Sequence, residues 1–152
     1  MKGYNHYRKD RIERTSGGVI VYISDTISYN VENIKLEVNF EYVFLKLSNN
    51  LSKPYYLLTI YTPQEVVTHL KKNLMESLRD YINEQIIIIG DLNIHFKRTV
   101  LHKDWIKTSK TNGFSQLINK DTRISTSSSS IIDHIYTNSQ YFQIGCHSTF
   151  II

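Results

Sequence analysis

The sequence predicts a mixed α/β sandwich, and three features indicate this fold class. The apolar run from Ile86 to Ile89 is typical of a strand buried on both faces at the centre of a sheet. Residues 42–47 and 55–61 are expected to be strands, and the Asn-, Ser- and Pro-containing segment between them predicts a hairpin-like connection. Residues 65–83 have apolar side chains at three- and four-residue spacing, which predicts an amphipathic helix.

The remaining elements follow from similar signals. A basic, polar lead-in covers residues 1–16, and Gly17-Gly18 then opens a strand over residues 19–23. A second basic stretch covers residues 94–110, with Trp105 inside it in an expected core role. We expect a helix over part of residues 111–119, a Ser- and Thr-rich loop at 125–130, and strands at 131–136 and 141–152.

Length and composition suit one domain over residues 1–152. The chain is 41% hydrophobic, and no apolar run approaches the roughly 20 residues that a transmembrane helix needs. The first residues are polar and are not expected to form a signal peptide, and the single cysteine, Cys146, favours a reducing compartment. We therefore expect an intracellular protein without a membrane partner. A pI of about 9.1 is compatible with a polyanionic partner.

The end of the isoleucine strand is the first candidate site. Gly90 ends the strand, and Asp91 and Asn93 follow two residues apart, so in an extended segment their side chains point the same way. Open α/β sheets bind ligands at the carboxyl ends of their strands. An aspartate at such a boundary can also be a simple turn or cap residue.

Several segments, taken in order, resemble the endonuclease/exonuclease/phosphatase superfamily, and most of all the endonuclease domain of non-LTR retrotransposons. They are Arg8-Lys9-Asp10-Arg11 with Gly17-Gly18-Val19-Ile20-Val21-Tyr22, Tyr61-Thr62-Pro63, Gly90-Asp91-Leu92-Asn93, and Thr122-Arg123 with Ser130-Ile131-Ile132-Asp133-His134-Ile135. The resemblance implies a DNase I-like α/β sandwich of two mixed sheets flanked by helices, lacking the first strand–helix–strand. It also implies Mg²⁺- or Mn²⁺-dependent hydrolysis of DNA phosphodiesters.

The same resemblance implies roles for individual residues. Asp91 would transfer a proton or orient the attacking water, and Asn93 would position Asp91 and bind the phosphate. Tyr61 would donate its phenol to a phosphate oxygen, and Asp133 would hold the imidazole of His147. His134 should face the other side of its strand and be structural. Phosphate or DNA contacts are expected from five further residues: Arg8, Arg11, Lys97, Arg98 and Ser130.

Two departures from the family pattern concern the metal. The family's metal-binding glutamate comes from strands that have no counterpart here. Cys146 stands where the family has a metal-binding aspartate, and sulfur is a poor ligand for Mg²⁺. Asp91 is then a weak remaining ligand.

Three functions therefore stay open. The first is a DNA-nicking domain, nuclear if functional, whose longer parent protein could hold a reverse transcriptase. The second is an inactive remnant that at most binds nucleic acid. The third, a phosphoinositide or small-ester phosphatase, is disfavoured by the segment from Arg8 to Tyr22.

Overall fold

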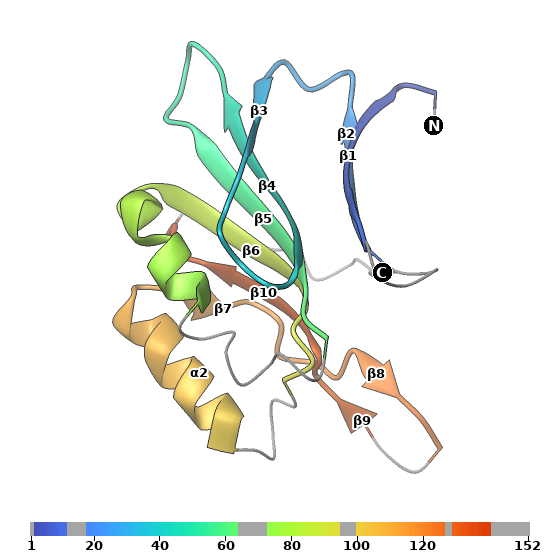
Figure 1. Ribbon diagram of the computed structural model, residues 1–152, viewed down its shortest axis with the longest axis vertical. Helices are drawn as coiled ribbons and strands as arrows, with labels where there is room; N and C mark the ends of the chain where they lie inside the picture. The colour runs from blue at the N-terminus through green and yellow to red at the C-terminus, as the bar shows by residue number, and fades with distance from the viewer. Residues whose placement is uncertain (1, 12–17, 64–72, 95–99, 127–128, 141–152) are drawn as a thin grey trace.

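A computed structural model describes residues 2–11, 18–63, 73–94, 100–126 and 129–140. Its main element is a six-stranded mixed sheet in the order β3-β4-β5-β6-β10-β7 (Figure 1). Neighbouring strands are antiparallel except for β5 and β6, which run parallel. The strands of this sheet are β3 (Asn30–Ile34), β4 (Glu41–Ser48), β5 (Tyr55–Tyr61), β6 (Gln85–Asp91), β7 (Ser115–Gln116) and β10 (Asp133–Thr137).

Each face of the sheet is covered by a different layer (Figure 1). The antiparallel pair β1 (Tyr4–Asp10) and β2 (Gly18–Ser24) lies on one face. There the alternate residues Val19, Val21 and Ile23 pack on Val43 and Leu45. The other face carries helix α2 (Val100–Thr111), a helical segment at 73–77 and a 3₁₀ turn, η2 (Arg79–Tyr81).

The core between the sheet and the helices is the larger of the two. Trp105 from α2 lies edge-on against Tyr136 of β10, with ring centroids 5.6 Å apart, and both are 1% exposed. Leu74 and Leu78 are fully buried in the same cluster. Trp105 therefore has the core role expected from the sequence. None of the described helices has the length and apolar character that crossing a bilayer requires.

The strongest sequence signals gave the right elements. The strands expected at 19–23, 42–47, 55–61, 86–89 and 131–136 correspond to β2, β4, β5, β6 and β10, and β4 pairs with β5 as a hairpin. The isoleucine strand β6 is central, between β5 and β10. The helix expected at 65–83 is observed in part, because residues 64–72 lie outside the described range. The strand expected at 141–152 also lies outside it.

Three expectations about secondary structure were wrong. The polar lead-in contains β1, whose side chains are nearly all exposed and so carry no apolar alternation. Two of the six residues in the expected 125–130 loop form a strand, since β9 (Ser129–Ser130) pairs with β8 (Arg123–Ile124). A helix was expected to begin at or after residue 111, but α2 ends at Thr111. Gly113, at φ +79°, terminates α2, and the amide of Phe114 donates to the carbonyl of Ser109.

Gly90 sets how closely β5 and β6 approach at the end of the pair. It lies opposite Ile60 with φ +154°, a backbone conformation that L side chains rarely adopt. A Cβ on Gly90 would lie 1.7 Å from the carbonyl oxygen of Ile60. Only glycine fits this position, directly before the first candidate site residue.

Candidate functional site

Three of the expected site residues lie side by side at one end of the six-stranded sheet. Tyr61 of β5 is in register with Asp91 of β6, and Asp91 is in register with Asp133 of β10. Because side chains alternate between the faces of a sheet, cross-strand partners project from the same face. This is the face that carries the β1–β2 pair, since Ile86 and Ile88 belong to the core on the other side.

Asp91 is half-buried and is held by its backbone and side chain together. Its carbonyl accepts a hydrogen bond from the amide of Thr62 at 3.0 Å, and its Oδ1 accepts one from the amide of Asn93 at 2.8 Å. Burial raises the pKa of Asp91, and the neighbouring charge of Asp133 raises it further, while the Asn93 amide and Arg123 act in the opposite direction. The carboxylate therefore holds a proton more readily than an exposed aspartate does, as suits a proton-transfer group.

Asn93 takes up an unusual backbone conformation, with φ +50°. Asparagine tolerates this left-handed region better than most residues. Its Nδ2 donates to the carbonyl of Thr62 at 2.8 Å, which ties the loop after β6 to the end of β5. Asn93 thus positions Asp91 through its backbone amide, and within the described residues one hydrogen of its side-chain amide is left for another acceptor.

The segment before Asp133 is anchored by the Thr122-Arg123 motif. The Oγ1 of Thr122 accepts hydrogen bonds from the amides of Ile132 and Asp133, each at 3.2 Å. Ser130, expected to contact phosphate, has 9% of its surface exposed and is paired with Arg123 in the β8–β9 ladder. Arg123 was not among the residues singled out from the sequence, although the Thr-Arg motif contains it.

A second group adjoins Tyr61 at the same end of the sheet. The guanidinium carbon of Arg11 lies 4.8 Å from the centre of the Tyr61 ring. Its Nε donates to Oε1 of Glu41 at 2.7 Å, and Glu41 is the cross-strand partner of Tyr61 on β4. The phenol of Tyr61 and the carboxylate of Glu41, in that order of importance, raise the pKa of Arg11. Nothing in the sequence pattern singles out Glu41.

Arg8 lies farther out, on β1. Its Nε donates to Oδ1 of Asp10 at 3.0 Å, and this contact lowers the pKa of Asp10. Both side chains are largely exposed, so much of the charge of Arg8 is already balanced by Asp10. His147, Cys146, Lys97 and Arg98 lie outside the described residues, so their roles stay predictions.

His134 is buried on the opposite face of β10, with 1% of its surface exposed. Oε1 of Gln116 accepts from the amides of Leu117 and Ile135, which turns the Nε2 donor of Gln116 toward Nδ1 of His134 at 2.8 Å. The other ring nitrogen then donates to the carbonyl of Ile94 at 3.2 Å. This histidine is structural, as the alternation of the strand predicts.

The carboxylates present suit a hard cation only in part. No cluster of three or more His, Cys, Asp or Glu side chains occurs in the described part of the chain. Asp91 and Asp133 are adjacent, and Mg²⁺ in proteins is often held by one or two carboxylates with waters and substrate phosphates. The pair therefore fits a weakly held magnesium ion completed by a phosphate group.

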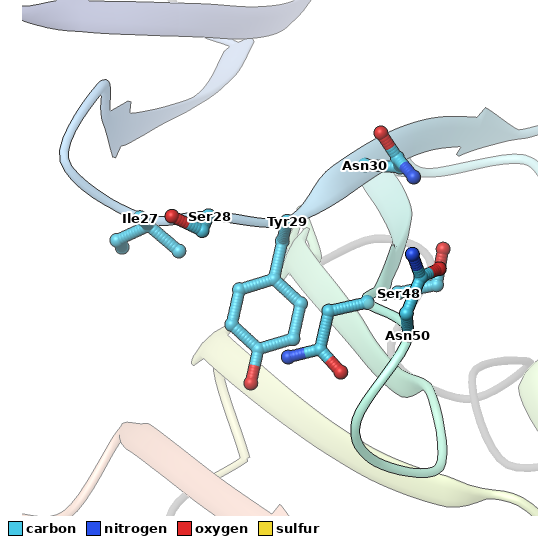
Figure 2. Close-up of a pocket in the computed structure, with 7 residues that line it drawn as sticks. Ile27, Ser28, Tyr29, Asn30, Ser48 and Asn50 are labelled. Atoms are coloured by element: carbon cyan, nitrogen blue, oxygen red, sulfur yellow. The ribbon is translucent and has the colours of Figure 1, made fainter.

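A separate polar hollow of about 270 Å³ lies at the far end of β4 (Figure 2). Ser48 in its lining ends the eight-residue strand β4, whereas Glu41 at the rim begins that strand, so the hollow and the rim lie at opposite ends of β4. Its lining contains no carboxylate, histidine or cation: Ile27, Ser28, Tyr29, Asn30, Ser48, Asn49 and Asn50. It lacks the groups for acid–base or phosphate chemistry.

Comparison with solved structures identifies the fold. The endonuclease domain of TRAS1, a telomere-specific non-LTR retrotransposon, matches with a TM-score of 0.72 and 12% identity over 90% of this chain and 68% of that one. The human Nocturnin catalytic domain matches with a TM-score of 0.61 and 13% identity, over 90% of this chain and 60% of that one. An endonuclease/exonuclease/phosphatase family protein from Leptotrichia buccalis gives 0.60 and 14%, over 92% and 62%. No family model and no curated protein sequence matches the chain.

These likenesses show that the chain has the DNase I-like α/β fold of endonuclease/exonuclease/phosphatase proteins. The chain spans less than two thirds of the length of the Nocturnin and Leptotrichia structures. At these identities the comparisons establish the fold, and the chemistry has to be argued from the site.

Proposed function

We propose that the rim formed by Tyr61, Asp91 and Asp133 binds a phosphodiester of DNA and hydrolyses it with the help of Mg²⁺ or Mn²⁺. The observation that carries the proposal is the shared register of these three residues on β5, β6 and β10. It brings a phenol and two carboxylates to one edge, together with Asn93, which holds Asp91 in place.

Each residue supplies a part of the chemistry. Asp91, whose pKa is raised by burial, takes a proton from the attacking water as the water oxygen bonds to phosphorus. The P–O bond to the leaving group breaks in the same displacement, and the departing alkoxide takes a proton from solvent. Tyr61 and the remaining amide hydrogen of Asn93 donate hydrogen bonds to the phosphoryl oxygens as negative charge grows there. Asp133 orients the imidazole of His147, which donates to the same group. A divalent ion beside Asp91 and Asp133 would neutralise charge on the phosphoryl oxygens.

DNA is the substrate that the likeness to the TRAS1 endonuclease domain favours. Arg8, Lys97, Arg98 and Ser130 are the proposed contacts with the DNA backbone, and such contacts would make binding sensitive to salt. In a longer parent protein, a reverse transcriptase domain could use the nicked strand as its primer. Action on chromosomal DNA would place the protein in the nucleus.

The test is nicking of supercoiled plasmid by the purified chain with millimolar Mg²⁺ or Mn²⁺. We expect nicked circles that disappear with EDTA and with Asp91→Ala. Asp80→Ala is the matched control, because Asp80 is an exposed carboxylate on η2, which lies on the face of the sheet opposite to the rim side chains. Folded protein that leaves the plasmid intact with both ions would refute catalysis by this chain.

The second candidate function is DNA binding without catalysis, and the two-carboxylate cluster favours it. Calorimetric titration with a short duplex separates the two candidates. A catalytic site should bind the duplex more tightly when Ca²⁺, a non-catalysing stand-in for Mg²⁺, is added. A non-catalytic remnant should bind with the same affinity with and without the ion.

A further inference from the structure

The row of cross-strand partners at the rim extends one strand beyond the proposed catalytic group. Glu41 of β4 pairs with Tyr61, so Glu41, Tyr61, Asp91 and Asp133 follow one another across β4, β5, β6 and β10. Arg11 lies over Tyr61 and is bonded to Glu41. The side chains of Arg11 and Glu41 are only 13% and 15% exposed. This ion pair is therefore built into the rim and is not a loose surface contact.

The charge of Arg11 is already matched by a carboxylate. Oε1 of Glu41 receives the Nε hydrogen of Arg11, and Oε2 of Glu41 is buried without a hydrogen-bond partner in the described part of the chain. A buried carboxylate with one free oxygen depends on the neighbouring guanidinium for its stability. Arg11 is thus held at Glu41, and pulling it away toward a phosphate would leave that carboxylate uncompensated.

Arg11 restrains Tyr61 by stacking on its ring, with the guanidinium carbon 4.8 Å from the ring centre. A guanidinium has N–H donors and no acceptor, so Arg11 does not take up the phenol hydrogen of Tyr61. That hydrogen is available to an acceptor at the rim, where the neighbour of Tyr61 in register on the same face is Asp91.

We propose that Arg11, held by Glu41, is a positioning residue that fixes the phenol of Tyr61 as a hydrogen-bond donor to a phosphoryl oxygen. This inference rests on the proposed function of the rim as a phosphodiester site. It assigns Arg11 a role through Tyr61, in place of direct contact with the phosphate. Glu41 gains a role that its isolated position in the sequence does not suggest.

The test is a double-mutant cycle on anion affinity, which needs no turnover. The probe is thymidine 3′,5′-bisphosphate, titrated calorimetrically into the wild-type chain, Tyr61→Phe, Arg11→Met and the double variant. We expect Tyr61→Phe to weaken binding about tenfold or more, the loss typical of a hydrogen bond to a charged group. Arg11→Met should weaken it about three- to tenfold, and should add almost nothing in the Tyr61→Phe background.

Additive losses in the cycle would overturn the inference, because they would mean that Arg11 contacts the anion itself. Glu41→Gln keeps the shape of the pair and serves if Arg11→Met fails to fold. It should weaken binding in the wild-type background and have almost no effect in the Tyr61→Phe background. An additive effect of Glu41→Gln would likewise show that Glu41 and Arg11 do not act through Tyr61.

The outcomes also separate this inference from the proposed function. If the wild-type chain does not bind the bisphosphate, the rim is not a phosphate site and both proposals fail. If it binds and the losses are additive, only the role given to Arg11 fails. An Arg11→Lys variant with wild-type affinity would likewise overturn the inference, since lysine keeps the charge and lacks the planar group that stacks on Tyr61.

Discussion

Asn93 offers the sharpest test of how the rim is built, because it combines a strained backbone with a bridging side chain. At φ +50° an alanine costs about 1–2 kcal/mol relative to a residue without that penalty. Loss of the 2.8 Å hydrogen bond from Nδ2 to the carbonyl of Thr62 costs about 1 kcal/mol more. Asn93→Ala should therefore lower the free energy of unfolding by about 2–3 kcal/mol.

Asn93→Gly separates the two contributions. Glycine adopts the left-handed backbone freely but cannot bond to Thr62, so it should cost only about 1–1.5 kcal/mol, including its larger unfolded-state entropy. For a chain of this size 1 kcal/mol changes Tm by about 2–4 °C, so Asn93→Ala should melt about 4–12 °C below the wild type.

Calorimetric melting of the three proteins measures the difference. Glycine and alanine variants that melt together would show that backbone strain does not govern this position. An alanine variant as stable as the wild type would refute both the strained turn and the bridge to Thr62. In the nicking assay the glycine and alanine variants should be impaired to a similar extent. Both keep the backbone amide that holds Asp91, and both lose the side-chain amide proposed to bind phosphate.

Two further predictions concern the neighbours of this turn. Gly90→Ala should lower the free energy of unfolding by about 3–5 kcal/mol, because its Cβ would lie 1.7 Å from the Ile60 carbonyl oxygen on a positive-φ backbone. Gly113→Ala, at φ +79° but in open space, should lower it by only about 1–2 kcal/mol. Urea unfolding of both variants measures the difference. Asp133→Asn should lower the pKa of Asp91 without returning it to the ordinary range, since burial is the larger cause of its raised value. Because a raised folded-state pKa gives stability that is lost as the pH rises through it, this variant should lose less stability between acidic and neutral pH. Carboxyl-carbon NMR titration measures the pKa, and an unchanged pKa of Asp91 in Asp133→Asn would show that the two carboxylates do not interact.

The parts of the fold predicted from the sequence are those where burial imposes a pattern. The isoleucine strand, the hairpin of β4 and β5, and β2 with its alternation of buried and exposed residues all contribute apolar side chains to a core. A core strand has to carry such residues at fixed spacing, so its sequence reveals it. The same reasoning placed His134 on the face of β10 opposite Asp133.

The elements that were missed lack that constraint. β1 is almost wholly exposed, and β3 at the sheet edge is buried only in part, so neither needs apolar residues at every second position. Helix α2 holds Trp105 against the sheet but is otherwise rich in Lys and Thr. With so few apolar residues, it shows no clear three- and four-residue apolar spacing in the sequence. The helix expected over part of residues 111–119 was wrong because Gly113 is the residue that ends α2.

For the site, the family resemblance pointed to the residues on β5, β6 and β10 but not to their connections. Asp91 and Asn93 are close in the chain, and their hydrogen bond could be anticipated from a turn. Arg11 and Glu41 are 30 positions apart, and only the packing of the β1–β2 pair on the sheet brings them together beside Tyr61. Contacts of that kind depend on tertiary structure, which no local pattern encodes.

The rim is also rigid for a reason that bears on its chemistry. The amide of Thr62 donates to Asp91, the side chain of Asn93 donates to Thr62, and these two bonds join the ends of β5 and β6. The amide of Leu92 donates to the carbonyl of Ile132, which extends the connection to β10. The carboxylate of Asp91 is therefore held in place before any substrate arrives, although burial disfavours its charged form. The proposed acid–base group is thus preorganised at the cost of burying Asp91, and preorganisation of that kind favours the proposal of hydrolysis over that of binding alone.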